Sequence, residues 1–180
     1  MVAFILNFVF FQACWLTIVI GAAHGLRWPG FALTALFLAW ELYRSEKPLA
    51  LLYLVGLGIA GGIIVDGGYA LSGVVDYQIP AGPLAPWWIL GMWVAFALTL
   101  TGSMGWMRSR PLIGSAMAGV AAPLAYIAGS HFGAIEFPRG QLMAIVVTAA
   151  TWIPTIYLMV RATNYWFADK ATTATVAAQP

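Results

Sequence analysis

Six long runs of apolar residues dominate the sequence and constrain its fold more than any other feature. A bilayer core about 30 Å thick takes about 20 apolar residues per helix, so runs of this length predict membrane-spanning helices. The chain is 62% hydrophobic and 8% charged, whereas a soluble domain is about 45–50% apolar and 25% charged. The runs cover Phe4–Ala23, Pro29–Tyr43, Pro48–Gly73, Pro86–Trp106, Pro111–His131 and Gln141–Val160.

We therefore expect an all-α fold: one polytopic transmembrane bundle of six helices with short loops over residues 1–167, and a polar tail over 168–180. Four runs begin at or next to a proline, which suits the first turn of a helix. The proline-rich segment from Tyr77 to Pro86 is expected to be ordered and to fold back over the bundle, because proline restricts the backbone. Lys and Arg are too scarce to neutralise nucleic-acid phosphates, so a nucleic-acid partner is excluded.

The positions of Lys and Arg predict the orientation of the bundle. Basic residues favour the cytoplasmic loops of membrane proteins. An arrangement with both termini in the cytoplasm places six basic residues inside and two outside, so we expect this orientation. The inner group is Arg44, Lys47, Arg108, Arg110, Arg161 and Lys170, and the outer pair is Arg27 and Arg139.

Small residues recur at helical spacing in the third and fifth runs. Gly58 and Gly62 share a face with Asp66, and Gly114 begins a similar stripe with Ala118. Small residues let transmembrane helices approach closely. We expect these two helices to be central and tightly packed, possible partners of each other. The letters G-x-G-x-x-G at Gly56–Gly61 lie inside an apolar run and predict no nucleotide site, because that motif needs a strand before it.

Asp66 is the most informative single residue. An ionisable side chain in a membrane span is expensive and commonly functional. Because its face carries glycines, it should point into the bundle and contact a polar partner. The candidates for that partner are His24, Arg27, His131 and Tyr69. Asp66, His24, His131, Tyr69 and the intramembrane Asn7 are therefore the candidates for ligand binding or proton handling.

Other polar residues are expected at the same outer face. Arg27, Asp76, Glu136 and Arg139 form an outer polar cluster on this prediction. No two histidines have a ligand spacing such as H-x-x-x-H, so no metal site is assigned, and the sequence identifies no cofactor or catalytic residue. Hydrated charges at the membrane surface explain the cluster equally well.

Several short motifs carry a family resemblance over nearly the whole chain. They are Leu6-Asn7-Phe8, Phe11-Gln12, Trp15, Gly21-Ala22, Asp66, Pro86-Trp87, Trp93, Arg110-Pro111, Pro123-Leu124-Ala125-Tyr126 and Gly129. In these features the sequence resembles an uncharacterised bacterial inner-membrane family, domain of unknown function 2878. The resemblance implies six spans, a bacterial inner membrane and no known activity. The family pattern places an Asn-His pair near Thr101 and Gly102, which this sequence lacks.

Three functions remain open on the sequence alone. The first is a non-catalytic protein that binds a lipid-like or hydrophobic small molecule, or an accessory subunit of a larger membrane complex. The second is a membrane-embedded lipid-modifying enzyme that uses Asp66 and the outer histidines as acid–base groups. The third is a small transporter, although the two halves of the chain show no convincing repeat.

Overall fold

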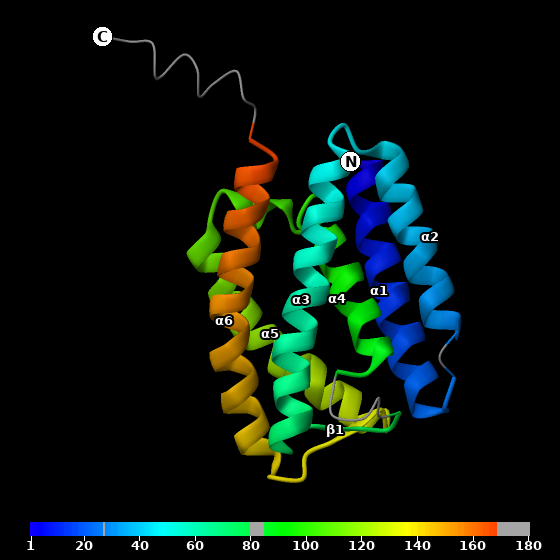
Figure 1. Ribbon diagram of the computed structural model, residues 1–180, viewed down its shortest axis with the longest axis vertical. Coiled ribbons are helices and arrows are strands. Elements are labelled where there is room, and N and C mark those ends of the chain that lie inside the picture. The colour runs from blue at the N-terminus through cyan, green and yellow to red at the C-terminus, as the bar shows by residue number, and fades with distance from the viewer. Residues whose placement is uncertain (27, 80–84, 169–180) are drawn as a thin grey trace.

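The chain folds into a helical bundle, which the computed structural model describes for residues 1–26, 28–79 and 85–168 (Figure 1). Within these ranges, four helices are long and apolar enough to cross a membrane. These are α1, α3, α5 and α6. The six helices are α1 (Val2–Ala23), α2 (Trp28–Arg44), α3 (Pro48–Ser72), α4 (Trp87–Thr99), α5 (Pro111–His131) and α6 (Gln141–Trp166). The predicted all-α fold with six helices is therefore confirmed for the described residues.

Helix α4 is shorter than the sequence predicted. It has 13 residues, a length of about 20 Å, and ends at Thr99 instead of continuing to Trp106. Turns and a short 3-10 helix, Gly105–Arg108, follow it. The amide N–H groups of Gly102 and Met104 donate to the carbonyl oxygen of Thr99, which closes these turns. The apolar run is therefore not one continuous helix.

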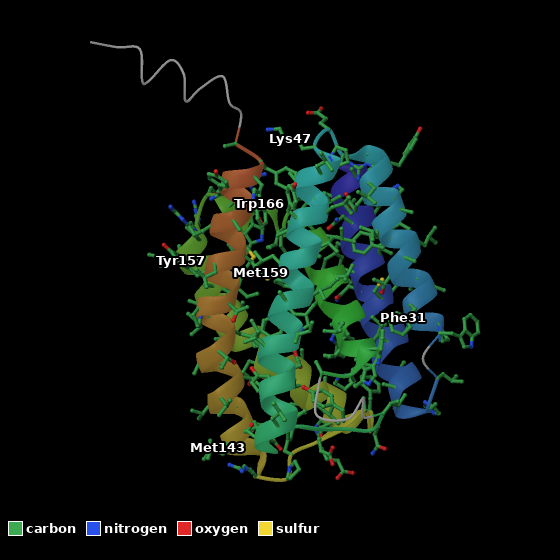
Figure 2. All side chains as sticks on the ribbon, in the orientation of Figure 1. Phe31, Lys47, Met143, Tyr157, Met159 and Trp166 are labelled. Atoms are coloured by element: carbon green, nitrogen blue, oxygen red, sulfur yellow. The ribbon has the colours of Figure 1, made fainter. Side chains whose placement is uncertain are left out.

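Helix α4 lies at the centre of the first four helices. Nine of its 13 residues are buried, and it packs against α1, α2 and α3. A helix that is surrounded by protein does not have to match the thickness of the bilayer, because irregular backbone at membrane depth is tolerated where protein covers it. Side chains on the outside are apolar: Phe31 and Met143 are exposed, whereas Met159 is buried between helices (Figure 2).

Helices α5 and α6 form a tightly packed pair. This pair meets the other four helices mainly where α6 packs against α3. Contacts of α5 with α1 and α4 are sparse. The expectation that the small-residue stripes of α3 and α5 pack on each other is therefore wrong. Gly58 and Gly62 of the α3 stripe face Trp93 of α4, and Gly114 of the α5 stripe faces Met107, so each stripe accommodates a bulky side chain from another part of the chain.

Gly58 and Gly62 allow α4 to approach α3 closely. A Cβ atom on Gly58 would lie 3.0 Å from the carbonyl oxygen of Trp93, and one on Gly62 would lie 2.5 Å from Trp93 Cδ1. On α5, a Cβ atom on Gly114 would lie 2.8 Å from Met107, and Ala118 is buried one turn further on. The three glycines therefore lie against bulky side chains, and Ala118 is buried.

A short antiparallel ladder joins two loops at one end of the bundle. Strand β1 (Asp76–Tyr77) pairs with β2 (Ile135–Glu136), Asp76 opposite Glu136. The start of α1 and the end of α6 lie at the opposite end (Figure 1). In the loop from Tyr77 to Pro86, which was predicted to be ordered, Tyr77, Ile79 and Ala85 are buried. Residues 80–84 of this loop lie outside the described part of the chain, as do Arg27 and residues 169–180.

Because Gly62 lies in close contact with Trp93, we expect one added methyl group at this position to lower the stability of the protein. Gly62→Ala forces the indole to move or the helices to separate, so we expect a loss of about 1–3 kcal/mol of stability. The matched control is Gly56→Ala on the same helix, where a Cβ atom meets nothing within 4 Å. Thermal unfolding in detergent measures both, and equal midpoints for the two variants would contradict this packing.

Candidate functional site

Asp66 lies in the interior of the bundle, fully buried, at the meeting point of four elements. Its carboxylate accepts three hydrogen bonds. Tyr77 Oη donates to Oδ1 at 2.6 Å, Tyr126 Oη donates to the same oxygen at 2.5 Å, and Trp93 Nε1 donates to Oδ2 at 2.6 Å. These four side chains, the Asp66 cluster, come from α3, β1, α5 and α4.

Helical spacing brings Asp66 and Trp93 together. Gly58, Gly62 and Asp66 follow each other at intervals of four residues, so they line one face of α3. Because that face has no side chain at Gly58 or Gly62, the indole of Trp93 lies directly over Gly62. One turn further along α3, its N–H reaches the carboxylate.

The chemistry of the Asp66 cluster suits an ionised carboxylate. An ionised carboxylate only accepts hydrogen bonds, and each of the three partners is a neutral donor. Tyr77 lies outside the helices, and burial, followed by the nearby Asp66, raises its pKa well above the usual value. Its hydroxyl therefore keeps its proton at neutral pH. Within the described residues, no Lys, Arg or His side chain bonds to Asp66.

The described partners of Asp66 are Tyr77, Trp93 and Tyr126, not His24, His131 or Tyr69, and Arg27, the fourth candidate, lies outside the described residues. His24 and His131 are exposed at helix ends, and His24 Nδ1 contacts the carbonyl oxygen of Ile20 in its own helix. Tyr69 bonds to Thr151 through its hydroxyl, and its ring meets the ring of Tyr126 edge to face at 5.8 Å. Tyr69 therefore borders the Asp66 cluster without bonding to the carboxylate.

Of the predicted outer polar residues, Asp76, Glu136 and Arg139 are exposed, and Arg27 lies outside the described residues. Asp76 and Glu136 face each other across the ladder, and Arg139 lies exposed near the end of α3. No ion pair joins these three side chains in the part of the chain that the structure describes. The same part holds no group of three His, Cys, Asp or Glu side chains placed to bind a metal. Solvation explains these charges.

Asn7 holds together the other end of α4. Its amide nitrogen donates to Glu41 Oε1 at 2.5 Å and to the Leu98 carbonyl oxygen at 3.2 Å. Its amide oxygen accepts from the backbone N–H and the hydroxyl of Ser103, at 2.8 and 2.6 Å. Glu41 also lies 3.8 Å from Arg44. Because all its polar atoms have partners, Asn7 is a structural link between α1, α2 and the unwound end of α4, not a free ligand-binding group.

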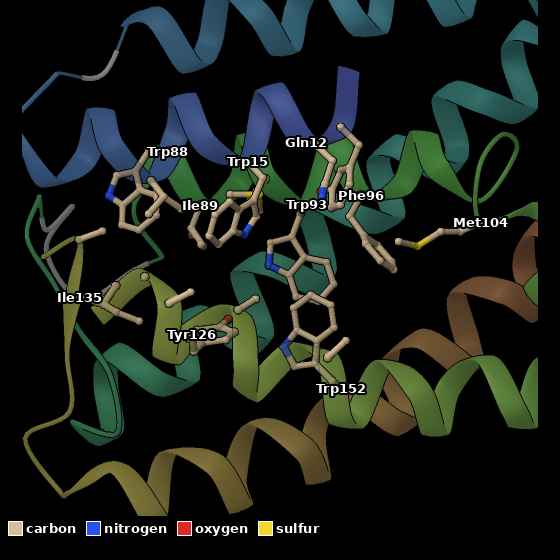
Figure 3. Close-up of a pocket in the computed structure, with 18 residues that line it drawn as sticks. Gln12, Trp15, Trp88, Ile89, Trp93, Phe96, Met104, Tyr126, Ile135 and Trp152 are labelled. Carbon is tan, nitrogen blue, oxygen red and sulfur yellow. The ribbon is translucent and has the colours of Figure 1, made fainter. Parts of the chain in front are cut away.

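An aromatic cavity of about 400 Å³ lies beside the Asp66 cluster, between α1 and α4 on one side and α5 on the other (Figure 3). Among the described residues, no charged side chain lines it. Trp93 and Trp152 stack in its wall at 4.8 Å between ring centroids, and Tyr126 meets Trp152 edge to face. The other lining residues are Phe11, Gln12, Trp15, Val19, Trp88, Ile89, Met92, Phe96, Met104, Ala121, Ala125, Ala128, Gly129, Ala134 and Ile135.

The sequence alone did not locate this cavity. Trp15, Trp93 and Trp152 lie within the apolar runs, but aromatic residues at membrane depth fill cores more often than they line pockets. The deciding feature is the sparse packing of α5 on α1 and α4, which no local pattern encodes. Trp93 and Tyr126 belong to both the cavity wall and the Asp66 cluster.

The chain was compared with known protein families, and one family model covers the residues of this site. The family described as "Protein of unknown function (DUF2878)" matches residues 4–158. The chain belongs to this family. The match confirms the resemblance and includes Asn7, the Asp66 cluster and Trp152. No curated protein and no solved structure matches the chain.

Replacement of the central carboxylate tests the Asp66 cluster. Asp66→Asn leaves one oxygen and one NH₂ group to face three donors, so at least one buried donor loses its partner. We expect a loss of about 1–3 kcal/mol of stability. Asp76→Asn at the exposed ladder is the control and should change stability by less than about 0.5 kcal/mol. Unfolding midpoints in detergent compare the two; an unchanged midpoint for Asp66→Asn would count against the hydrogen bonds.

Proposed function

We propose that this protein is a non-catalytic membrane protein that binds a hydrophobic small molecule in the aromatic cavity. The observation that supports the proposal is the cavity itself. Its volume of about 400 Å³ lies within the range of about 300–1,000 Å³ typical of small-molecule sites. Such sites are mostly apolar with a few placed polar groups, and the lining residues that the structure describes include no charged side chain.

The shape of the wall favours a flat or chain-like ligand. Trp93 and Trp152 present stacked rings, and Phe96 and Tyr126 meet Trp152 at interplanar angles of 80°. Aromatic faces and edges contact flat apolar groups over a large area. Methionine side chains such as Met92 and Met104 adapt to irregular shapes. A lipid chain, an isoprenoid or a conjugated ring fits these surfaces better than a sugar or an ion.

The ligand reaches the cavity from the bilayer on this proposal. Gln12 of α1 and Ala121 of α5 line the cavity and are exposed. Both lie near the middle of their helices, Val2–Ala23 and Pro111–His131, so the opening faces the middle of the membrane and not water. The sparse contact between α1 and α5 supports an opening at this place.

The alternative functions have less support. An enzyme that pairs Asp66 with His24 or His131 would need these groups within hydrogen-bond reach, but both histidines are exposed at helix ends. A transporter would need a path to both ends of the bundle, and the unwound end of α4 is closed by the Asn7 hydrogen bonds. A role as an accessory subunit of a larger membrane complex is compatible with ligand binding.

We also propose a bacterial inner membrane as the location, with both termini in the cytoplasm. The six-to-two distribution of Lys and Arg supports this orientation. The start of α1 and the end of α6 lie at the same end of the bundle (Figure 1), as the orientation requires. A reporter that is active only in the cytoplasm should be active when fused to the C-terminus. A reporter that is active only in the periplasm should be inactive at the same position.

Filling the cavity tests the proposed function. Ala125→Leu places three more carbon atoms against the lining, so we expect at least a tenfold loss of binding to an apolar aromatic probe. Anthracene is suitable, because energy transfer from the cavity tryptophans reports its binding to protein in detergent. The matched control is Ala116→Leu, an exposed position of α5 away from the cavity. Equal probe binding by both variants would contradict the proposal.

A further inference from the structure

Gln12 is an accessible polar side chain on the wall of the aromatic cavity, and it has no hydrogen-bond partner. It lines the cavity from α1 and is exposed, so a molecule in the cavity can reach its amide group (Figure 3). Its side chain makes no hydrogen bond within the described part of the chain. A glutamine amide both donates and accepts hydrogen bonds. A ligand that carries an oxygen atom can therefore pair with it.

The position of Gln12 along α1 keeps its amide far from the membrane surfaces. Gln12 lies at the midpoint of the 22 residues of α1, about 15 Å from either end of the helix. Phe8 and Leu16, one turn before and one turn after it, are exposed and apolar, as lipid-facing side chains are. A polar group in hydrocarbon without a hydrogen-bond partner costs free energy, and lipid chains supply no partner. A polar group of a bound ligand would remove that cost.

A second polar group accompanies Gln12 on the same side of α1. Trp15 follows three residues later, so the two side chains are neighbours on the helix surface, and both line the cavity. Trp15 is half-buried, and its indole nitrogen, unlike those of Trp88 and Trp152, is not fully enclosed by protein. Figure 3 shows this nitrogen directed from α1 toward the cavity. Because an indole N–H and an amide NH₂ both donate, the two groups suit an oxygen acceptor.

We propose that Gln12 selects the ligand of the aromatic cavity by binding a neutral oxygen group, a hydroxyl or a carbonyl, of a hydrophobic molecule at the middle of the membrane. This inference rests on the proposed function and specifies its ligand class. The apolar part of the ligand fills the space between α4 and α5, and its oxygen lies at the opening beside α1. A pure hydrocarbon leaves the Gln12 amide unpaired. A charged head group is disfavoured, because no charged side chain occurs among the described lining residues.

Two probes of matched shape separate this inference from the proposed function. Hydroxymethylanthracene and ethylanthracene, substituted at the same ring position, differ only in a hydroxyl that replaces a methyl group. Their affinities are compared after correction for the concentration of each probe in the micelles. One additional hydrogen bond predicts about fivefold tighter binding of hydroxymethylanthracene to the wild-type protein.

Replacement of Gln12 by an apolar side chain of the same length should remove this preference. Gln12→Met retains an unbranched side chain but has no amide group, so we expect it to bind ethylanthracene as the wild-type protein does and hydroxymethylanthracene no more tightly. The matched control is Thr17→Val, which removes a polar group of the same helix outside the described lining and should retain the fivefold preference.

The outcomes are distinct. Equal binding of both probes to the wild-type protein overturns the inference and leaves the proposed function standing, and so does a preference that survives in Gln12→Met. If Gln12 instead joins two copies of the chain, Gln12→Met lowers the oligomeric state and leaves the preference unchanged, which also overturns the inference. Failure of both probes to bind overturns the proposed function as well.

A measurement on the wild-type protein decides if Gln12→Met does not fold. Nuclear magnetic resonance of protein with nitrogen-15-labelled glutamine resolves the side-chain NH₂ signals, and Gln12 is the glutamine among the described lining residues. A glutamine NH₂ signal that moves downfield with hydroxymethylanthracene and not with ethylanthracene supports the hydrogen bond. Identical spectra with the two probes overturn it.

Discussion

The structure depends on one constraint, the need of a buried carboxylate for hydrogen-bond donors. A charged side chain inside a membrane protein is costly unless it is hydrogen-bonded. Asp66 meets this need with donors from three other elements, Tyr77, Trp93 and Tyr126. Its hydrogen bonds therefore fix α4, α5 and the β1 loop relative to α3. They connect α3 and α4 to α5, which otherwise contacts α4 only sparsely.

The cavity follows from the way in which these elements are held. The α5–α6 pair meets the rest of the bundle through α3, the ladder and the Asp66 cluster, so space remains between α5 and the pair α1 and α4. Aromatic side chains border that space. Because Trp93 and Tyr126 donate to Asp66 with one end and line the cavity with their rings, the carboxylate also sets the shape of the site. At the opposite end of α4, Asn7 performs the corresponding structural role for the unwound backbone.

Much of the fold could be predicted from the sequence, because apolar length and helix-starting prolines are local signals. The prolines Pro48 and Pro111 do begin helices, and the four-residue spacing of Gly58, Gly62 and Asp66 correctly indicated a carboxylate that points inward. The partners of Asp66 could not be predicted. Tyr77 and Tyr126 are 11 and 60 residues away in the sequence, and a tyrosine in an apolar run looks like any core aromatic. The early end of α4 was also missed, although Gly102, Ser103 and Gly105 after Thr99 are poor helix formers.

The hydrogen bond between Trp93 and Asp66 offers the most direct test of the account. Nuclear magnetic resonance of the nitrogen-15-labelled indoles, in protein held in micelles, resolves each tryptophan N–H separately. The account predicts that the Trp93 indole proton is shifted downfield and exchanges slowly with water, and that the shift disappears when Asp66 is replaced by Asn. A Trp93 proton that exchanges as fast as that of the exposed Trp87, with a position insensitive to the change at Asp66, would contradict it.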